Sequence, residues 1–358
     1  MHKKALKHFY ILLSSNKLSI GLISSYLITV IFSYYFLSHS VDDIFYFGSA
    51  VNIFENGKYA IYVGDKAFTV FYLFPTFSLL NSFFLEVTDF LSIDINHLNY
   101  RLFSKVILLL LFFSILYYVH RLTNASIAAK NLAIIILMTS PYMLGSIGSV
   151  RPEPLGVLLI CLSLIFFSNW KQSYKELNLI LSNFFLGLAC ITHPIFIIPS
   201  MLIGIHMLVS SLKLCGFLTM VKSFFVLIIP VACYLIWLIL NFDEAYIELS
   251  NRFIESNSGL LYQNLYVNIF STLDLSETPI TTAIYRLYFS FPFYLVLGIV
   301  IYNLVRCSDN KRNPELIFGI VGAIINFIFI PQYDFHFALL VFFTLCIASS
   351  LFYERNQN

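Results

Sequence analysis

The chain has 358 residues, a formal net charge of +2, and a composition that is 59% hydrophobic and only 11% charged. Ordinary soluble domains are roughly 45–50% apolar and about 25% charged, so these values exclude a water-soluble globular protein and indicate a polytopic membrane protein. The charges form no basic stripe, which speaks against nucleic acid as a partner. The cysteines lie singly in apolar runs or at their ends without any CxxC pair, which favours apolar packing over a disulfide framework or a metal site.

Ten apolar runs are long enough to cross a bilayer, which takes about 20 residues in a helix. We therefore expect an all-α integral membrane protein with a single domain, residues 1–358. The predicted spans are 18–37, 100–119, 131–148, 154–169, 177–192, 194–212, 220–240, 285–305, 315–331 and 335–353. The first run is longer than the apolar core of a cleavable signal, about 7–15 residues, so we expect it to remain as the first span.

The distribution of Lys and Arg gives the orientation. With the N-terminus in the cytoplasm, about 14 of the 21 basic residues lie on the cytoplasmic side, as the positive-inside rule requires. An eleventh span at 67–85, where Pro75 interrupts the apolar run, would reverse every later loop, so we expect an interfacial helix there. Both termini are then cytoplasmic, and two long loops, 38–99 and 241–284, lie on the outer side of a membrane that we expect to be the inner membrane of a bacterium.

An acidic pair, Asp42-Asp43, directly follows the first span and opens an amphipathic stretch that stops at Asn56-Gly57. Membrane proteins tolerate charge mainly beside water, a cavity or a partner, so the pair is a candidate for chemistry. Asp42 also occupies an N-cap position and Asp43 a first turn, so a capped surface helix explains Asp42 about as well as catalysis does, and explains Asp43 somewhat better. One apolar face predicts a helix lying along the interface; its residues are Ile44, Phe47, Val51 and Phe54.

Three short outer connections place polar residues at the ends of spans. Arg151 and Glu153 lie in the first connection. An Arg at the end of a span usually contacts lipid head groups, but an Arg on the outer side is less common, so Arg151 is less routine than such a contact. His193 lies in the second and is suited to binding phosphate or to acid–base chemistry near neutral pH, although a lone histidine is more often structural. The third holds a polar cluster that is costly unless it borders water: Tyr333, Asp334 and His336.

The outer face thus combines carboxylates with scattered cations at the bilayer boundary. Transfer of a sugar from a lipid phosphate needs a base for the acceptor hydroxyl, and cations or N–H donors for the departing phosphate. No HxxxH or HExxH spacing indicates a metal site. We expect no cofactor, with Mg²⁺ or Mn²⁺ held by the two carboxylates as the open alternative.

Several short motifs accompany this layout. The stretch after Asp42-Asp43 closes in the turn Gly57-Lys58-Tyr59, a Pro-bearing segment follows at 71–75, and Arg101 opens the second span. Further along lie Arg-Pro-Glu-Pro at 151–154 and Thr-His-Pro at 192–194. Together these motifs resemble the GT-C superfamily of polytopic glycosyltransferases, which includes protein O-mannosyltransferases, aminoarabinose transferases of lipid A and many bacterial cell-envelope sugar transferases.

The resemblance implies that Asp42 is a general base and that Asp43 is a second carboxylate that positions the acceptor or the base. It also implies an inverting transfer from a polyprenyl-phosphate sugar to a glycan, lipid or protein of the cell envelope. The expected phosphate-binding residues are Arg101, Arg151, His193 and His336. The expected residues for the acceptor or the sugar are Glu153, Tyr333 and Asp334.

Two other functions remain open from the sequence. A polysaccharide polymerase or ligase of the O-antigen type would depend on arginines of the later outer loops, here Arg252 and Arg286. A lipid or solute transporter would place polar residues near the middle of the membrane, whereas most of the predicted spans carry only Ser, Thr or Asn at their centres.

Overall fold

The computed structural model describes residues 16–36, 41–63, 66–68, 74–93, 100–119, 149–243 and 245–246, with a few helical positions within 127–135 and 317–325. This part of the chain is mostly helical, as predicted. Its helices are α2 (Asn16–Phe36), α3 (Val41–Asn56), α4 (Thr76–Phe90), α5 (Leu102–Tyr117), α8 (Glu153–Ser173), α9 (Glu176–Cys190), η2 (Pro194–Phe196), α10 (Ile197–Cys215) and α11 (Phe217–Leu240). The all-α prediction missed a short antiparallel hairpin, in which β1 (Ile61–Val63) pairs with β2 (Lys66–Phe68).

Three helices of the described part are long and apolar enough to cross a membrane, namely Glu153–Ser173, Pro194–Cys215 and Phe217–Leu240. The shorter apolar helices Leu102–Tyr117 and Glu176–Cys190 coincide with two more of the predicted spans, and α2 coincides with the first. The apolar helices are compatible with insertion into a membrane. The predicted spans at 131–148, 285–305, 315–331 and 335–353 fall wholly or largely outside the described residues.

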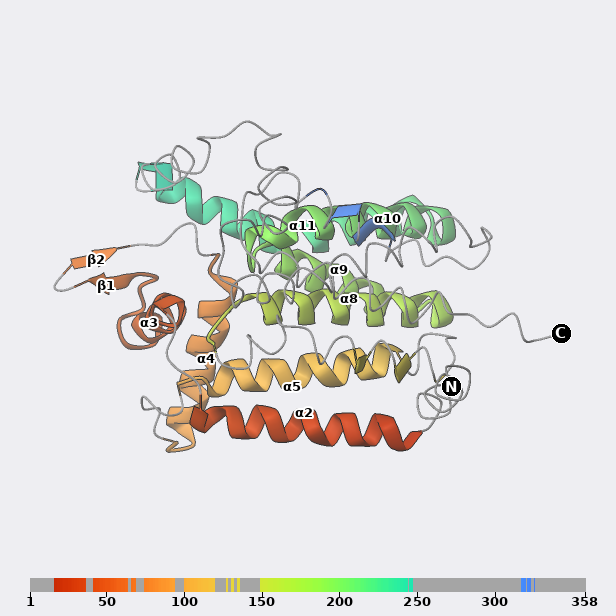
Figure 1. Ribbon diagram of the computed structural model, residues 1–358. Helices are drawn as coiled ribbons and strands as arrows, with labels where there is room; N and C mark the ends of the chain where they lie inside the picture. The colour runs from red at the N-terminus through yellow and green to blue at the C-terminus, as the bar shows by residue number, and fades with distance from the viewer. Residues whose placement is uncertain are drawn as a thin grey trace, which may run out of the picture.

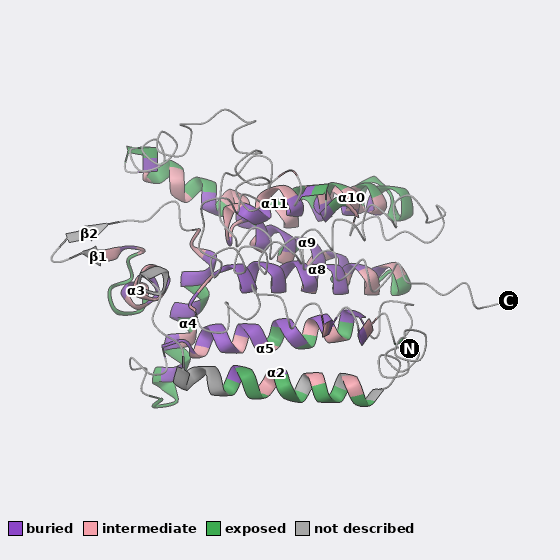
Figure 2. Cartoon of the chain, viewed as in Figure 1, coloured by how far each residue is buried: buried purple, intermediate pink, exposed green. Residues whose placement is uncertain are grey.

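Helix α8 lies at the centre of the bundle (Figure 2). It is buried over 78% of its apolar stretch, compared with 17% for α11. It packs against α5 on one side and α9 on the other, so other helices cover most of its apolar surface. The hydroxyls of Ser163 on α8 and Ser182 on α9 lie 3.2 Å apart, and Ser182 also contacts the Met207 sulfur on α10 at 3.3 Å. These polar contacts join α8, α9 and α10. They help to select which helices pack together, because apolar side chains alone pack almost equally well against any apolar helix.

Helices α3 and α4 do not run along the bundle but cross one end of it, next to the hairpin (Figure 1). The Oγ atoms of Ser49 on α3 and Ser78 on α4 form a hydrogen bond of 2.7 Å, and both residues are fully buried. Asn52 donates to the carbonyls of Lys58 and Ala60, at 2.9 and 3.1 Å, and so holds the chain between α3 and β1. We call this end of the bundle the α4 end.

Helix α3 ends as the sequence predicts, with Asn56 as its last residue and Gly57 at a positive φ of 64°. It begins at Val41, so Asp42 and Asp43 both lie in the first turn and Asp42 is not the N-cap. The buried residues described on α3 are Tyr46, Ser49, Ala50 and Asn52. Within the predicted apolar stripe Phe47 and Val51 are only half-buried and Phe54 is exposed, so α3 turns a face of mostly small or polar side chains toward the protein.

Helix α4 corresponds to the predicted interfacial helix, but it starts later than predicted, after Pro75, and it runs on to Phe90. Its buried face is more polar than that of a typical helix of a soluble protein, although Phe77 and Leu85 are also buried. The buried face is rich in hydroxyl and amide groups, namely Thr76, Ser78, Asn81, Ser82 and Thr88. Phe83 and Phe90 are 62% and 86% exposed, which fits a helix at the level of a membrane surface.

The contact between α9 and α11 depends on a glycine. A Cβ atom at Gly187 would lie 2.3 Å from the carbonyl oxygen of Leu227, which is a backbone atom. We therefore expect Gly187→Ala to push the two helices apart and lower the free energy of unfolding by about 1–3 kcal/mol, as overpacking usually does. Thermal unfolding of the purified protein in detergent measures this.

Gly48→Ala on α3 is the matched control, because no atom lies within 4 Å of its added Cβ. In a helix that substitution should be neutral or stabilising by up to about 1 kcal/mol. Equal thermal midpoints for the two variants would contradict the close packing at Gly187.

Candidate functional site

The polar residues singled out in the sequence come from the ends of three helices that meet at the α4 end. Arg101 is the N-cap of α5, Arg151 and Glu153 lie at the start of α8, and His193 is the N-cap of η2, just after α9. Helices α5 and α8 run in the same direction and start at this end (Figure 1). The bundle therefore gathers residues that are up to 92 positions apart in the sequence, counted from Arg101 to His193.

Helix α4 is attached directly to the segment that carries His193. The Thr76 hydroxyl at the start of α4 donates to the Ile191 carbonyl at 2.6 Å, two residues before His193. Just before α4, the Phe74 ring packs edge-on against Tyr234 of α11, with 4.9 Å between the ring centroids. Because α4 is also bonded to α3, these contacts connect the helix that bears Asp42 and Asp43 to the His193 segment.

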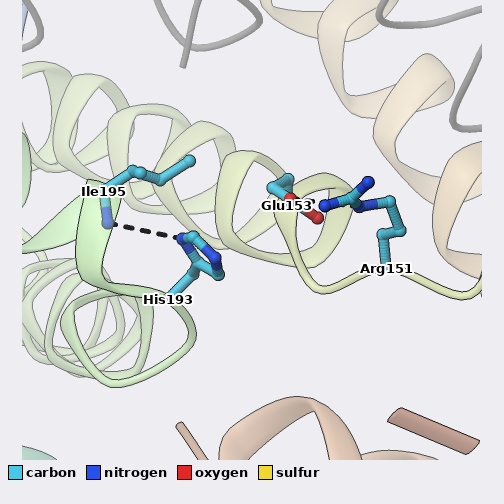
Figure 3. A network of polar contacts seen from close by, with 4 residues as sticks. All are labelled: Arg151, Glu153, His193 and Ile195. Carbon is cyan, nitrogen blue, oxygen red and sulfur yellow. Dashed lines mark hydrogen bonds and ion pairs between the residues drawn. The ribbon is translucent and has the colours of Figure 1, made fainter. Parts of the chain in front are cut away.

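Arg151 and Glu153 form a partly buried ion pair. The Arg151 Nε donates to the Glu153 Oε1 at 3.2 Å, and the side chains are only 15% and 7% exposed (Figure 3). Glu153 is the first residue of α8, where the positive end of the helix dipole favours a carboxylate. The second carboxylate oxygen, Oε2, is buried and accepts no hydrogen bond from any residue of the described part. Glu153 therefore holds an acceptor for which the described residues supply no donor.

His193 is a neutral donor in this site. Its Nδ1 accepts the backbone N–H of Ile195 at 3.4 Å, which leaves the proton of the neutral ring on Nε2 (Figure 3). Burial, together with the positive charge of Arg151, lowers the pKa of His193 to about 3. The prediction that His193 serves as an acid or base near neutral pH is therefore not favoured, whereas donation from Nε2 remains available.

A glycine allows His193 to lie beside the ion pair. The fully buried ring of Phe196 in η2 occupies the position where a Cβ of Gly156 would lie, only 2.1 Å from the Phe196 Cε2. Gly156 is one turn after Glu153 on α8. The absence of a side chain at Gly156 thus lets η2 approach the start of α8, and with it His193.

Two cations of α5 are buried near its start. Arg101 and Lys105 are 6% and 8% exposed and one helical turn apart, and the Arg101 guanidinium lies 5.0 Å from the centre of the Tyr100 ring. Arg101 is among the site residues predicted from the sequence, whereas Lys105 is not. The spacing of four residues, which puts both on one helix face, was the signal that could have identified Lys105.

Several predicted site residues are not placed. The backbones of Asp42 and Asp43 lie in the first turn of α3, but their side chains are outside the described part of the structure. Tyr333, Asp334 and His336 lie wholly outside it, as do Arg252 and Arg286. Among the side chains that are described, no three of the metal-binding types come together.

No model of a known protein family matches the chain, and a search of curated proteins finds no similar sequence. The functional assignment therefore depends on the residues of the site.

The low pKa of His193 predicts how stability depends on pH. Unfolding restores a pKa near 6.5, so between about pH 6.5 and pH 3 the unfolded chain binds the proton that the folded chain rejects. Stability should then fall with decreasing pH, by up to about 2 kcal/mol between pH 7 and pH 5. His193→Asn keeps an acceptor for the Ile195 N–H but cannot titrate, so it should remove this part of the pH dependence.

Thermal or denaturant unfolding of both proteins at pH 7 and pH 5 makes the comparison. An unchanged pH dependence in His193→Asn would show that His193 is not held neutral by the fold.

Proposed function

We propose that the chain is a membrane glycosyltransferase that moves a sugar from a polyprenyl-phosphate donor to an envelope glycan, lipid or protein on the outer side of the membrane. The observation that carries the proposal is that the buried charged residues of the described part, Arg101, Lys105 and Glu153, all lie at one end of the bundle. The acidic first turn of α3, the Arg151–Glu153 pair and the cations of α5 all belong to this end. The layout of motifs that resembles GT-C enzymes supports the same reading.

In the proposed reaction Asp42 is the general base. Its carboxylate takes the proton of the acceptor hydroxyl while the hydroxyl oxygen attacks the anomeric carbon of the donor sugar. The bond from that carbon to the phosphate oxygen breaks, its electron pair stays on the phosphate, and the configuration at the carbon is inverted. Asp43, its neighbour in the first turn of α3, would position the acceptor.

The departing phosphate requires positive groups, and α5 offers the most suitable ones. Arg101 lies at the N-terminus of this helix, where backbone N–H groups and the helix dipole favour an anion, and Lys105 follows one turn later. A guanidinium can bind two phosphate oxygens at once, which fixes the geometry of the leaving group. His336, Tyr333 and Asp334 remain predicted contributors from the last outer connection.

The proposed topology keeps ten spans, cytoplasmic termini and a bacterial inner membrane. The described helices support the orientation. Most cations of the α8–α11 hairpins lie at the ends opposite to Arg151 and His193, which would be the cytoplasmic side under the positive-inside rule. They include Lys171, Lys175, Lys213 and Lys222. Lys222 pairs with Glu176 at 2.8 Å, which ties the starts of α11 and α9 together at that opposite end.

The exposed apolar face of α4 suits sideways entry of the lipid donor from the outer leaflet. Leu79, Phe83 and Phe90 project away from the protein, while Thr76 at the start of the same helix is bonded beside His193. A prenyl chain that lies in the bilayer along this face would hold its phosphate near the α4 end.

Asp42→Asn is the test of the catalytic assignment. Loss of a general base typically costs about 100-fold to 10,000-fold in rate, so the variant should lose nearly all transfer while its expression and membrane insertion stay near normal. Release of bare prenyl phosphate from a labelled prenyl-phosphate sugar, in vesicles that hold the purified protein and an acceptor, measures the reaction.

Glu55→Gln provides the matched control, because Glu55 is exposed in the last turn of the same helix. It should retain full activity. Substantial transfer by Asp42→Asn would overturn the role of Asp42 as base.

A further inference from the structure

We propose that the cluster of Arg151, Glu153 and His193 binds the sugar of the donor through its hydroxyl groups, with Glu153 as the residue that distinguishes a glycosylated lipid phosphate from a bare one. The inference rests on the proposed function and deepens it. It also reassigns Arg151 and His193, which the sequence analysis expected to bind the phosphate.

The charge of the cluster argues against a phosphate as its ligand. The positive charge of Arg151 is balanced by the Glu153 carboxylate at 3.2 Å, in surroundings that are largely buried. His193 adds no charge, because its Nδ1 is committed to the Ile195 N–H and its ring is neutral. A phosphate bound to Arg151 would therefore face a carboxylate in a region of low dielectric, where like charges repel strongly.

The hydrogen-bonding capacity of Glu153 indicates what the ligand supplies. Its Oε2 is buried without a hydrogen bond from any described residue, and a buried carboxylate oxygen left unsatisfied is costly. The missing partner must be a donor. A phosphodiester has no O–H or N–H to give, whereas each sugar hydroxyl donates one hydrogen bond and accepts others.

The other two residues complement such a hydroxyl group. The Nε2–H of His193 and the guanidinium of Arg151 are donors, and they lie on either side of the carboxylate acceptor (Figure 3). Neighbouring hydroxyls of a sugar could donate to Glu153 Oε2 and accept from His193 and Arg151 at the same time. The cations that favour a phosphate, Arg101 and Lys105, belong to a different helix, so sugar and phosphate would be bound by separate groups.

The experiment compares two probes, a short-chain prenyl phosphate and the same lipid with mannose, glucose or galactose on its phosphate. Dissociation constants are measured with the full-length protein in nanodiscs, and the best-bound glycosylated probe is used. Glu153→Ala should weaken the glycosylated probe at least tenfold, because a hydrogen bond to a charged group is lost. The bare prenyl phosphate should bind within twofold of the unaltered protein, or more tightly, because a negative charge has been removed.

Glu153→Gln covers the case in which Glu153→Ala fails to fold, since it keeps the size of the side chain and one acceptor oxygen. It should weaken binding of the glycosylated probe at least threefold and leave binding of the bare prenyl phosphate unchanged. Arg101→Gln should weaken both probes to a similar degree, because both carry the phosphate. Glu55→Ala, an exposed glutamate of α3, should change neither.

Two results would overturn the inference while the proposed function stands: equal weakening of both probes by the Glu153 variants, or unchanged binding of the glycosylated probe. Binding of only the bare lipid by the unaltered protein would also overturn it. If the unaltered protein binds neither probe, the proposed function itself fails.

Discussion

The close contact between η2 and α8 is the constraint on which the site depends. Gly156 leaves room for the Phe196 ring, and this ring fixes where the turn after α9 lies relative to the start of α8. His193 is thereby held beside Arg151 and Glu153, and the Ile191 carbonyl in the same turn receives the Thr76 hydroxyl of α4. One residue without a side chain thus determines the position of a helix end, of an imidazole and of the helix that crosses the bundle.

The polarity of α3 and α4 is compatible with the surroundings that a bilayer provides. In water the apolar face of such a helix would turn inward, since burial of apolar surface drives folding. Here the inward faces carry many small or polar side chains beside Tyr46, Phe77 and Leu85, including the bonded pair Ser49 and Ser78, while other large apolar residues of α4, among them Phe83 and Phe90, are exposed. Lipid accepts these apolar side chains at no cost, whereas backbone and hydroxyl groups must find partners within the protein. Polar groups are consequently concentrated at the α4 end.

Much of the fold could be predicted from the sequence, because apolar runs and the glycine after α3 are local signals. The start of α8 beside Arg151 and the end of α3 at Gly57 lie where the sequence predicts them. The apolar stripe of α3 predicted a helix along the interface but not which of its faces the protein buries, since periodicity alone does not tell whether protein or lipid lies on the apolar side. The hairpin was missed because its strands are three residues long. In the site, the sequence identified Arg151, Glu153 and His193 as candidate residues, but the neutral state of His193 could not be predicted. That state comes from a fold that brings its ring against Arg151 from 42 residues away.

The separation of charge at the α4 end has a consequence for the proposed reaction. The glycosidic bond that breaks joins a neutral sugar to an anionic phosphate. An enzyme therefore lowers the barrier by placing groups with no net charge around the sugar and positive groups around the phosphate. In the proposed reaction the Arg151–Glu153 pair with a neutral His193 would provide the first, and the cations of α5 would provide the second. As the bond breaks, negative charge grows on the phosphate alone. Positive charge grows on the sugar at the same time, so a carboxylate beside the sugar and cations beside the phosphate would favour the transition state over the bound donor.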